Sequence, residues 1–146
     1  MRRLLLHALA ATVISGAALA VAAPVMAEDV VAVVSAKSPV RDLNANQVAD
    51  IFLGKTSRFP DGSPAVPIDL SEESPLRDRF YAAYTGKSPA QVKAHWSKII
   101  FTGRGQPPRQ ASSIGEAKKL LAENPNAIAY IDASQVDSSV RVLAGR

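Results

Sequence analysis

The strongest constraint on the fold is a short run of apolar, mostly β-branched residues with no polar interruption, Val30–Val34. Strands that read as continuous apolar runs, rather than as alternating apolar and polar residues, are typical of sheets covered on both faces. A second apolar run, Ala127–Ile131, lies near the other end of the chain. Helical patterns occupy the sequence between the two runs, which indicates an α/β domain.

Four helices are expected between these strands, and each follows a residue suited to capping a helix N-terminus. These capping residues are Asn44, Ser74, Ser88 and Ser113. Gly54 ends the first helix, where a left-handed residue is needed. The spacing of apolar residues places Leu76, Phe80 and Ala83 on the inner side of the second helix, and Val92, Trp96, Ile99 and Ile100 on that of the third.

Two further segments read as strands. Residues 65–70 form the first, which we place at a sheet edge or starting late because Pro67 has no N–H to donate. Residues 140–143 form the closing strand, whereas the Gly- and Pro-rich residues 101–109 read as a loop. The predicted fold class is α/β, with a mostly parallel or mixed sheet flanked by helices.

Residues 1–27 have the features of a secretory signal peptide. Arg2 and Arg3 precede an apolar stretch, and the segment ends in Val25-Met26-Ala27, which resembles a cleavage site. An uncleaved membrane anchor is the alternative, but Pro24 interrupts the stretch and no positive charge follows it. We therefore expect a single domain over residues 28–146, 119 residues long, in the bacterial periplasm or outside the cell.

Composition excludes several classes of function. The chain has no cysteine, and without Arg2 and Arg3 it carries 15 basic and 13 acidic residues, too even a balance for a nucleic-acid binder. His95 is the one histidine of residues 28–146 and has neither a metal-ligand spacing nor a partner carboxylate in sequence. With no G-x-S-x-G motif either, we expect no enzyme, no catalytic residue, no metal and no cofactor.

The junction between the second strand and the helix after Ser74 is the candidate binding site. A helix N-terminus presents free N–H groups and a partial positive charge, which suits an anion. Ser74 could add its hydroxyl and Arg77 its guanidinium, with Ser71 as a weaker third contact. The alternative is that Ser74 only caps the helix and Arg77 pairs with Glu73 or another acid.

Arg77 shares one side of its helix with two tyrosines, Tyr81 and Tyr84, at spacings of four and seven residues. Together with the loop of residues 101–109, this side is a candidate contact surface for a partner. The alternative is that both rings cover the edge of the core and leave their hydroxyls in water.

Several segments occur in an order that points to a known family: Val30–Val34, Ser38-Pro39-Val40, Val48–Lys55, the Phe80 helix after Ser74, and Asn124–Ile131. In this order they resemble one lobe of the periplasmic phosphate-binding protein of phosphate ABC transporters. The segment from Trp96 through Phe101–Pro108 is similar to that of the small, single-lobe proteins of this family. The resemblance covers residues 30–143.

The resemblance implies one lobe of the type 2 periplasmic-binding fold and binding of phosphate or a similar oxyanion. In two-lobed relatives the corresponding helix opens with serine, glycine, threonine and commonly arginine, of which only Ser74 and Arg77 carry over. Pro75 has no amide donor and Leu76 no hydroxyl. Because the relatives hold phosphate between two lobes and 119 residues supply one, we expect weak affinity.

The leading hypothesis is a secreted, non-enzymatic binding module that resembles the substrate-binding component of phosphate ABC transport. It would bind phosphate or another small oxyanion weakly at Ser74, Arg77 and Ser71. An ABC transporter permease, another envelope protein and a second copy of the chain are candidate partners. The alternative is an envelope protein–protein interaction module that keeps the fold without capturing a ligand.

Overall fold

Five strands form one mixed sheet in the order β3-β2-β4-β1-β5. The computed structural model describes residues 29–143, so the expected signal peptide lies outside the described residues. The strands are β1 (Val30–Ser35), β2 (Val66–Leu70), β3 (Arg109–Ala111), β4 (Ala127–Asp132) and β5 (Val140–Val142). Within residues 29–143, no helix has both the length and the apolar character needed to cross a membrane.

The two apolar runs are neighbouring inner strands of this sheet. β1 pairs with β4 in antiparallel register from Val30↔Asp132 to Val34↔Ile128, and with β5, also antiparallel, on its other edge. All six residues of β4 are buried. The absence of alternation in both runs is thus explained by burial on both faces of the sheet. The sheet is mixed, because β2 is parallel to both β3 and β4.

Pro67 lies in a strand with neighbours on both sides, so of the two predicted alternatives the edge position is wrong and the late start is confirmed only for the pairing with β3. Successive residues of a strand direct their N–H groups to opposite sides, and the N–H of Val66 points towards β4, where it donates to Asn126. The nitrogen of Pro67 therefore faces β3. Pairing with β3 begins only at Ile68, so the missing donor of Pro67 leaves no gap in the ladder.

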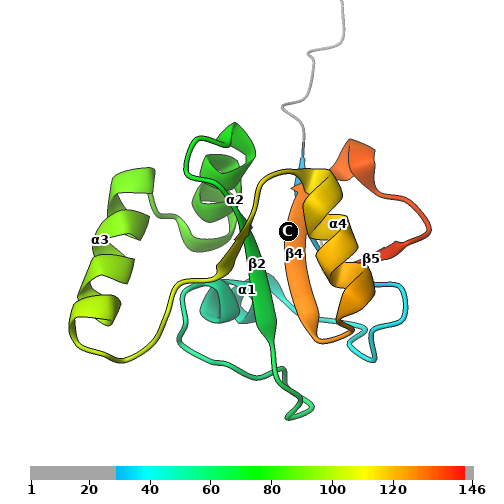
Figure 1. Ribbon diagram of the computed structural model, residues 1–146, viewed down its shortest axis with the longest axis horizontal. Coiled ribbons are helices and arrows are strands. Elements are labelled where there is room, and N and C mark those ends of the chain that lie inside the picture. The colour runs from blue at the N-terminus through cyan, green and yellow to red at the C-terminus, as the bar shows by residue number, and fades with distance from the viewer. Residues whose placement is uncertain (1–28, 144–146) are drawn as a thin grey trace, which may run out of the picture.

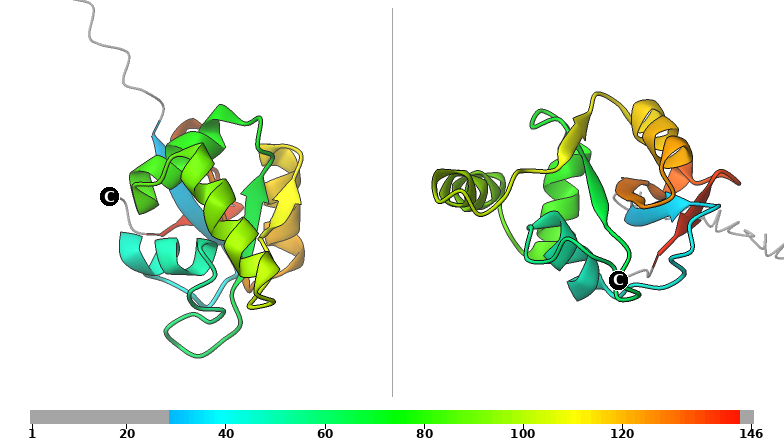
Figure 2. Two further views of the ribbon diagram at one scale, coloured as in Figure 1. Left: turned by 90° about the vertical axis from the view of Figure 1, so that its left-hand side faces the viewer. Right: turned by 60° about the horizontal axis from the view of Figure 1, so that its bottom comes forward.

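Helices cover both faces of the sheet (Figures 1 and 2). The helices are α1 (Ala45–Phe52), α2 (Pro75–Thr85), α3 (Pro89–Phe101) and α4 (Ile114–Glu123), followed by the 3-10 helix η1 (Ala133–Gln135). α1 and α2 pack on one face and α4 on the other, whereas α3 stands beside α2 at one end of the molecule (Figures 1 and 2).

Local capping chemistry confirms the predicted helix ends. Asn44 and Ser88 form capping boxes with the glutamine three residues further on, and Ser113 accepts from the N–H of Glu116. Gly54 follows the end of α1 with a positive φ of 71°. Ser74 holds the N-cap position of α2, but its hydroxyl makes no capping hydrogen bond.

α2 buries a wider side than the apolar spacing predicts. Leu76 and Phe80 are buried as expected, and the candidate contact residues Arg77, Tyr81 and Tyr84 are buried as well, whereas Ala83 is only half-buried. The reason is an aromatic cluster between α2 and the sheet, in which the Phe80 ring stacks on the Tyr130 ring with centroids 4.0 Å apart. Tyr84 also reaches β1, where its hydroxyl accepts from the N–H of Ala32 at 3.2 Å. A contact surface built from these tyrosines is therefore excluded. The alternative interpretation is confirmed for the rings, which are buried, but it is wrong for the hydroxyls, which bond to Asp69 and Ala32 and not to water.

α3 contributes less to the core than its apolar spacing predicts. Val92 and Trp96 are its buried residues, while Ile100 is 54% exposed and Phe101 92% exposed. The chain then returns to the sheet as β3, which begins at Arg109, the last residue of the segment expected to be a loop. β3 extends the sheet on the side where α3 stands (Figure 1).

Candidate functional site

The site is built around Asp69, near the carboxyl end of β2. Asp69 is only 2% exposed. Ligand sites in α/β sheets commonly lie at the carboxyl ends of parallel strands, where the following helix also begins. A carboxylate buried at this place must be paired and hydrogen-bonded to remain charged.

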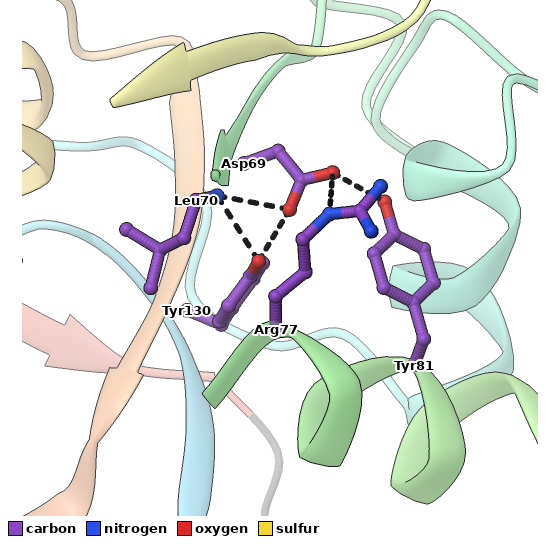
Figure 3. A network of polar contacts seen from close by, with 5 residues as sticks. All are labelled: Asp69, Leu70, Arg77, Tyr81 and Tyr130. Atoms are coloured by element: carbon purple, nitrogen blue, oxygen red, sulfur yellow. Dashed lines mark hydrogen bonds and ion pairs between the residues drawn. The ribbon is translucent and has the colours of Figure 1, made fainter. Parts of the chain in front are cut away.

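Two tyrosines and one backbone amide donate to the Asp69 carboxylate (Figure 3). The Tyr81 hydroxyl donates to Oδ2 at 2.7 Å, and the Tyr130 hydroxyl donates to Oδ1. The N–H of Leu70 is directed at both Oδ1, at 2.9 Å, and the Tyr130 oxygen, at 3.0 Å. Asp69 thereby ties β2 to β4 and α2.

Arg77 supplies the positive charge that opposes Asp69. Its Nε lies 3.4 Å from Oδ2, and its guanidinium carbon lies 5.0 Å from the centroid of the Tyr81 ring (Figure 3). Burial lowers the pKa of Arg77, but the attraction of Asp69 and the neighbouring tyrosines outweighs this effect and the pKa is raised. Arg77 is therefore a permanent cation.

Both tyrosine hydroxyls are held in the neutral form. Burial raises the pKa of Tyr81 and of Tyr130, and the negative charge of Asp69 raises each further. A hydroxyl that donates to a carboxylate loses that hydrogen bond when it ionises, which acts in the same direction. Neither tyrosine is suited to act as a base near neutral pH.

A pocket of about 210 Å³ opens beside the Asp69–Arg77 pair. It is bounded by the end of β2, the start of α2, one side of α3 and the chain leading into β3. Its lining residues are Asp69, Glu72, Arg77, Lys93, Trp96, Ser97, Ile100, Pro107, Pro108 and Gln110. We call it the Arg77 pocket. Its charged lining consists of two carboxylates and two cations, so its formal charge balances.

Of the three predicted site residues, Arg77 lines the Arg77 pocket, whereas Ser71 and Ser74 are not among its lining residues. The Ser74 N–H donates to Ser71 O at 3.0 Å, and the Arg77 N–H donates to Ser74 O at 3.1 Å. These two amides are thus used within the turn that starts α2. Arg77 pairs with an acid, as the alternative interpretation holds, but the acid is Asp69 and not Glu73.

Sequence reasoning missed Asp69 and Tyr130. The available signal was polarity inside apolar strands, since an aspartate in Val66–Leu70 and a tyrosine in Ala127–Asp132 both require partners. Their pairing also depends on register: β2 and β4 match at Pro67↔Ile128, so two residues further on each strand reaches Asp69 and Tyr130. Only the sheet order brings these two strands together.

His95 has a structural contact. Its Nε2 lies 2.7 Å from the carbonyl oxygen of Leu53, so this nitrogen carries the hydrogen and ties α3 to the end of α1. In the described part of the chain, no three histidine, aspartate or glutamate side chains gather in a way that could hold a metal ion.

Comparison with solved structures relates this fold to phosphate transport proteins. A Clostridium perfringens structure, described as a phosphate ABC transporter substrate-binding protein with bound phosphate, matches with a TM-score of 0.62 and 25% identity over 78% of this chain. An ABC-type phosphate transport receptor from Vibrio cholerae matches with a TM-score of 0.52 and 17% identity over 78% of this chain. PstS from Borrelia burgdorferi matches with a TM-score of 0.59 and 12% identity over 79% of this chain.

The match covers 43%, 44% and 46% of those three chains, so this protein spans less than half of their length. No protein-family model matches the sequence, and no curated protein matches it significantly. The resemblance found in the sequence is confirmed at the level of the fold: the chain has the α/β architecture of one lobe of a phosphate-binding substrate-binding protein.

Proposed function

We propose that the protein binds phosphate or a similar small oxyanion weakly in the Arg77 pocket and is not an enzyme. The observation that carries this proposal is a buried arginine that lines a pocket at the carboxyl end of β2. The fold around this pocket is shared with a substrate-binding protein solved with phosphate. Ser74 and Ser71, which do not line the pocket, remain proposed contacts of the ligand.

The guanidinium of Arg77 has donors left for a ligand. Its Nε faces Asp69 in an ion pair without a hydrogen bond, and among residues 29–143 no hydrogen bond is formed by its two terminal nitrogens. A planar guanidinium with two free terminal NH2 groups matches two oxygens of a phosphate or sulfate. Lys93, on the facing side of α3, adds a second positive charge to the same pocket.

Weak affinity follows from the charge balance. Asp69 already neutralises Arg77, and the exposed Glu72 repels an entering anion. The pocket is also open to water, which competes for the same donors and screens the charges. A second protein surface over the pocket would exclude this water and tighten binding.

A pair of adjacent glutamates provides a matched test. Glu72 lines the Arg77 pocket, whereas Glu73, which is also exposed, is not among its lining residues. Removing the charge of Glu72 takes away a surface repulsion of the order of 0.2–1 kcal/mol, so Glu72→Gln should tighten phosphate binding by a factor of roughly 1.4 to 5. Glu73→Gln should change it less, and Lys93→Gln should weaken it.

Calorimetry or NMR titration with phosphate, sulfate and a dicarboxylate measures these affinities. Circular dichroism of each variant checks that the fold is kept. If Glu72→Gln and Glu73→Gln change phosphate affinity equally, or if the wild-type protein gives no response at millimolar phosphate, the proposed site is wrong.

We also propose that the protein acts in the periplasm after cleavage of residues 1–27, with an ABC transporter permease or a second copy of the chain as partner. The structures it matches include an ABC-type phosphate transport receptor, which supports this class of partner. Crosslinking in cells, followed by identification of the attached protein, tests the partner.

An envelope protein–protein interaction module is the second candidate function. The observation that favours it is the end of α3, where Phe101 is 92% exposed and Ile100 54% exposed. Two large apolar side chains exposed next to each other on the surface are suited to contact with another protein. If the ligand titrations show no binding, sedimentation of the wild-type protein and of Phe101→Ser tests this second function. Association of the wild-type protein that is lost in Phe101→Ser would favour the interaction module.

A further inference from the structure

A second pocket, on the other side of α3, carries a strong excess of positive charge. Its volume is about 280 Å³, and its lining residues are Leu53, Gly54, Lys55, His95, Lys98, Ile99, Thr102 and Arg104. Three of these are cations and none is a carboxylate. The Arg77 pocket, in contrast, balances two cations with two carboxylates.

The two pockets are separated by α3 itself. Lys93, Trp96, Ser97 and Ile100 line the Arg77 pocket, and His95, Lys98, Ile99 and Thr102 line the second one. Each set has helical i, i+3, i+4, i+7 spacing, and a shift of two residues rotates the stripe by about 200° around the helix. Ligands in the two pockets would therefore contact opposite sides of α3.

The cations at the second pocket are not needed to complete the helix ends. Cationic side chains often satisfy carbonyl groups at helix C-termini, and both α1 and α3 end here. In this protein other groups do so: the Nε2–H of His95 donates to Leu53 O, and the Thr102 hydroxyl is 2.9 Å from Lys98 O and 3.2 Å from Ile99 O. The head groups of Lys98 and Arg104 remain available.

These head groups also lack a neutralising acid. Within residues 29–143, Lys98 and Arg104 form no ion pair, and Lys55 has a single exposed one with Asp50 at 3.8 Å. Three like charges around one pocket repel one another, and an entering anion removes this repulsion. A guanidinium and two ammonium groups are the donors that proteins use for phosphate groups.

We propose that this pocket, which we call the Lys98 pocket, is a second anion site that takes a phosphate group, either free or as a monoester. Leu53 and Ile99 provide an apolar wall beside the cations, against which the carbon skeleton of an ester can lie. The inference is independent of the function proposed for the Arg77 pocket, because the two sites share no lining residue.

NMR titration of the purified protein with inorganic phosphate and with glycerol 3-phosphate tests the proposal. Sodium chloride at equal ionic strength serves as the blank. The amides of Gly54, Lys55, Gly103 and Arg104 report on the Lys98 pocket, and those of residues 69–77 report on the Arg77 pocket. Tighter binding of the ester than of phosphate would identify a phosphomonoester as the ligand, and equal binding would identify the free anion.

A charge-matched pair of variants completes the test. Lys98→Gln/Arg104→Gln removes two charges from the pocket, and Lys37→Gln/Lys119→Gln removes two charges from exposed positions outside it. We expect at least a tenfold loss of affinity at the Lys98 pocket in the first variant and less than a twofold loss in the second. Equal losses, or shifts that the sodium chloride blank reproduces, would overturn the site. If phosphate shifts the amides of the Lys98 pocket in the wild-type protein but not those of residues 69–77, the function proposed for the Arg77 pocket is contradicted and the Lys98 pocket is not.

Discussion

Asp69 shows how a single residue can define the centre of a site without itself being free to bind. Its two oxygens accept from Tyr81, Tyr130 and Leu70, and Arg77 lies beside them. A buried carboxylate with this many partners fixes the positions of β2, β4 and α2 relative to one another. The same contacts hold the Arg77 side chain against the pocket wall, so the polar network sets the orientation of the proposed anion donor.

Alkaline pH should unfold the protein through this network. Because the pKa values of Tyr81 and Tyr130 are raised in the folded state, folding holds their protons more tightly than the unfolded chain does. The resulting stability is fully present below about pH 10, the ordinary tyrosine value, and is lost as the pH rises towards the folded pKa values. Urea unfolding at several pH values between 8 and 12 measures this loss.

Variants separate the network from general alkaline effects. Tyr130→Phe leaves one oxygen of buried Asp69 with fewer donors, which should lower the free energy of unfolding by about 1–3 kcal/mol at neutral pH and flatten the loss above pH 10. Tyr84→Phe removes a buried hydroxyl that contacts Ala32 and not Asp69. The free energy of unfolding should therefore fall more steeply above pH 10 in Tyr84→Phe than in Tyr130→Phe. An equal slope in both variants would contradict the role of Asp69.

At the scale of elements, local chemistry predicts the ends of the helices and apolar spacing predicts most of their buried residues, but neither predicts how wide the buried side of α2 is. The capping pairs Asn44–Gln47 and Ser88–Gln91 depend on contacts within one turn, which the sequence contains in full. The buried side of α2 depends on which strand lies beneath it. Tyr81 and Tyr84 are compatible with either side, and the partners that decide, Asp69 and Ala32, come from other elements.

The site was predictable to the same limited degree. Arg77 was found because a strand–helix junction suits anions whatever surrounds it. Asp69 and the lining from α3 were missed because they meet Arg77 only through the sheet order and the path of the chain. β3 was missed for a related reason: its three residues, Arg-Gln-Ala, have no strand pattern, and pairing with β2 alone defines them.

The junction between α1 and α3 depends on one glycine. Gly54 has a φ of 71°, and a Cβ atom there would lie 2.8 Å from a ring carbon of Trp96. Gly86 has nearly the same φ, 69°, but open space around the Cβ position. Gly86→Ala should therefore lose about 1–2 kcal/mol, the cost of a left-handed conformation, and Gly54→Ala should lose more because the indole must also move.

Thermal or urea unfolding of the two alanine variants gives this comparison directly. The difference between them isolates the Trp96 contact, because the backbone cost is common to both. Equal losses would mean that the indole moves freely and that α3 is not held at this point. A larger loss in Gly54→Ala would show that the fit of Trp96 against α1 fixes the position of α3.

At the scale of the whole molecule, α3 is the least anchored helix and yet borders both pockets. Val92 and Trp96 are the only residues of α3 that are buried, and the helix stands at the end of the molecule beside α2 (Figures 1 and 2). Its two sides line the Arg77 pocket and the Lys98 pocket. Elements with few buried contacts unfold locally at a lower free energy than the core. Both pockets should therefore lose one wall when α3 detaches from the rest of the domain.

Hydrogen exchange should therefore divide the molecule into two parts. We expect the amides of residues 93–101 in α3 to exchange at least tenfold faster than those of β1 and β4, whose residues are almost all buried. Phosphate that binds in either pocket contacts α3 in its docked position only, so millimolar phosphate should slow exchange in α3 and leave β4 unchanged. Trp96→Ala should speed exchange in α3 and weaken phosphate binding together. If phosphate protects α3 in wild type but Trp96→Ala binds it equally well, docking of α3 and binding are independent, and the pockets are complete without this helix.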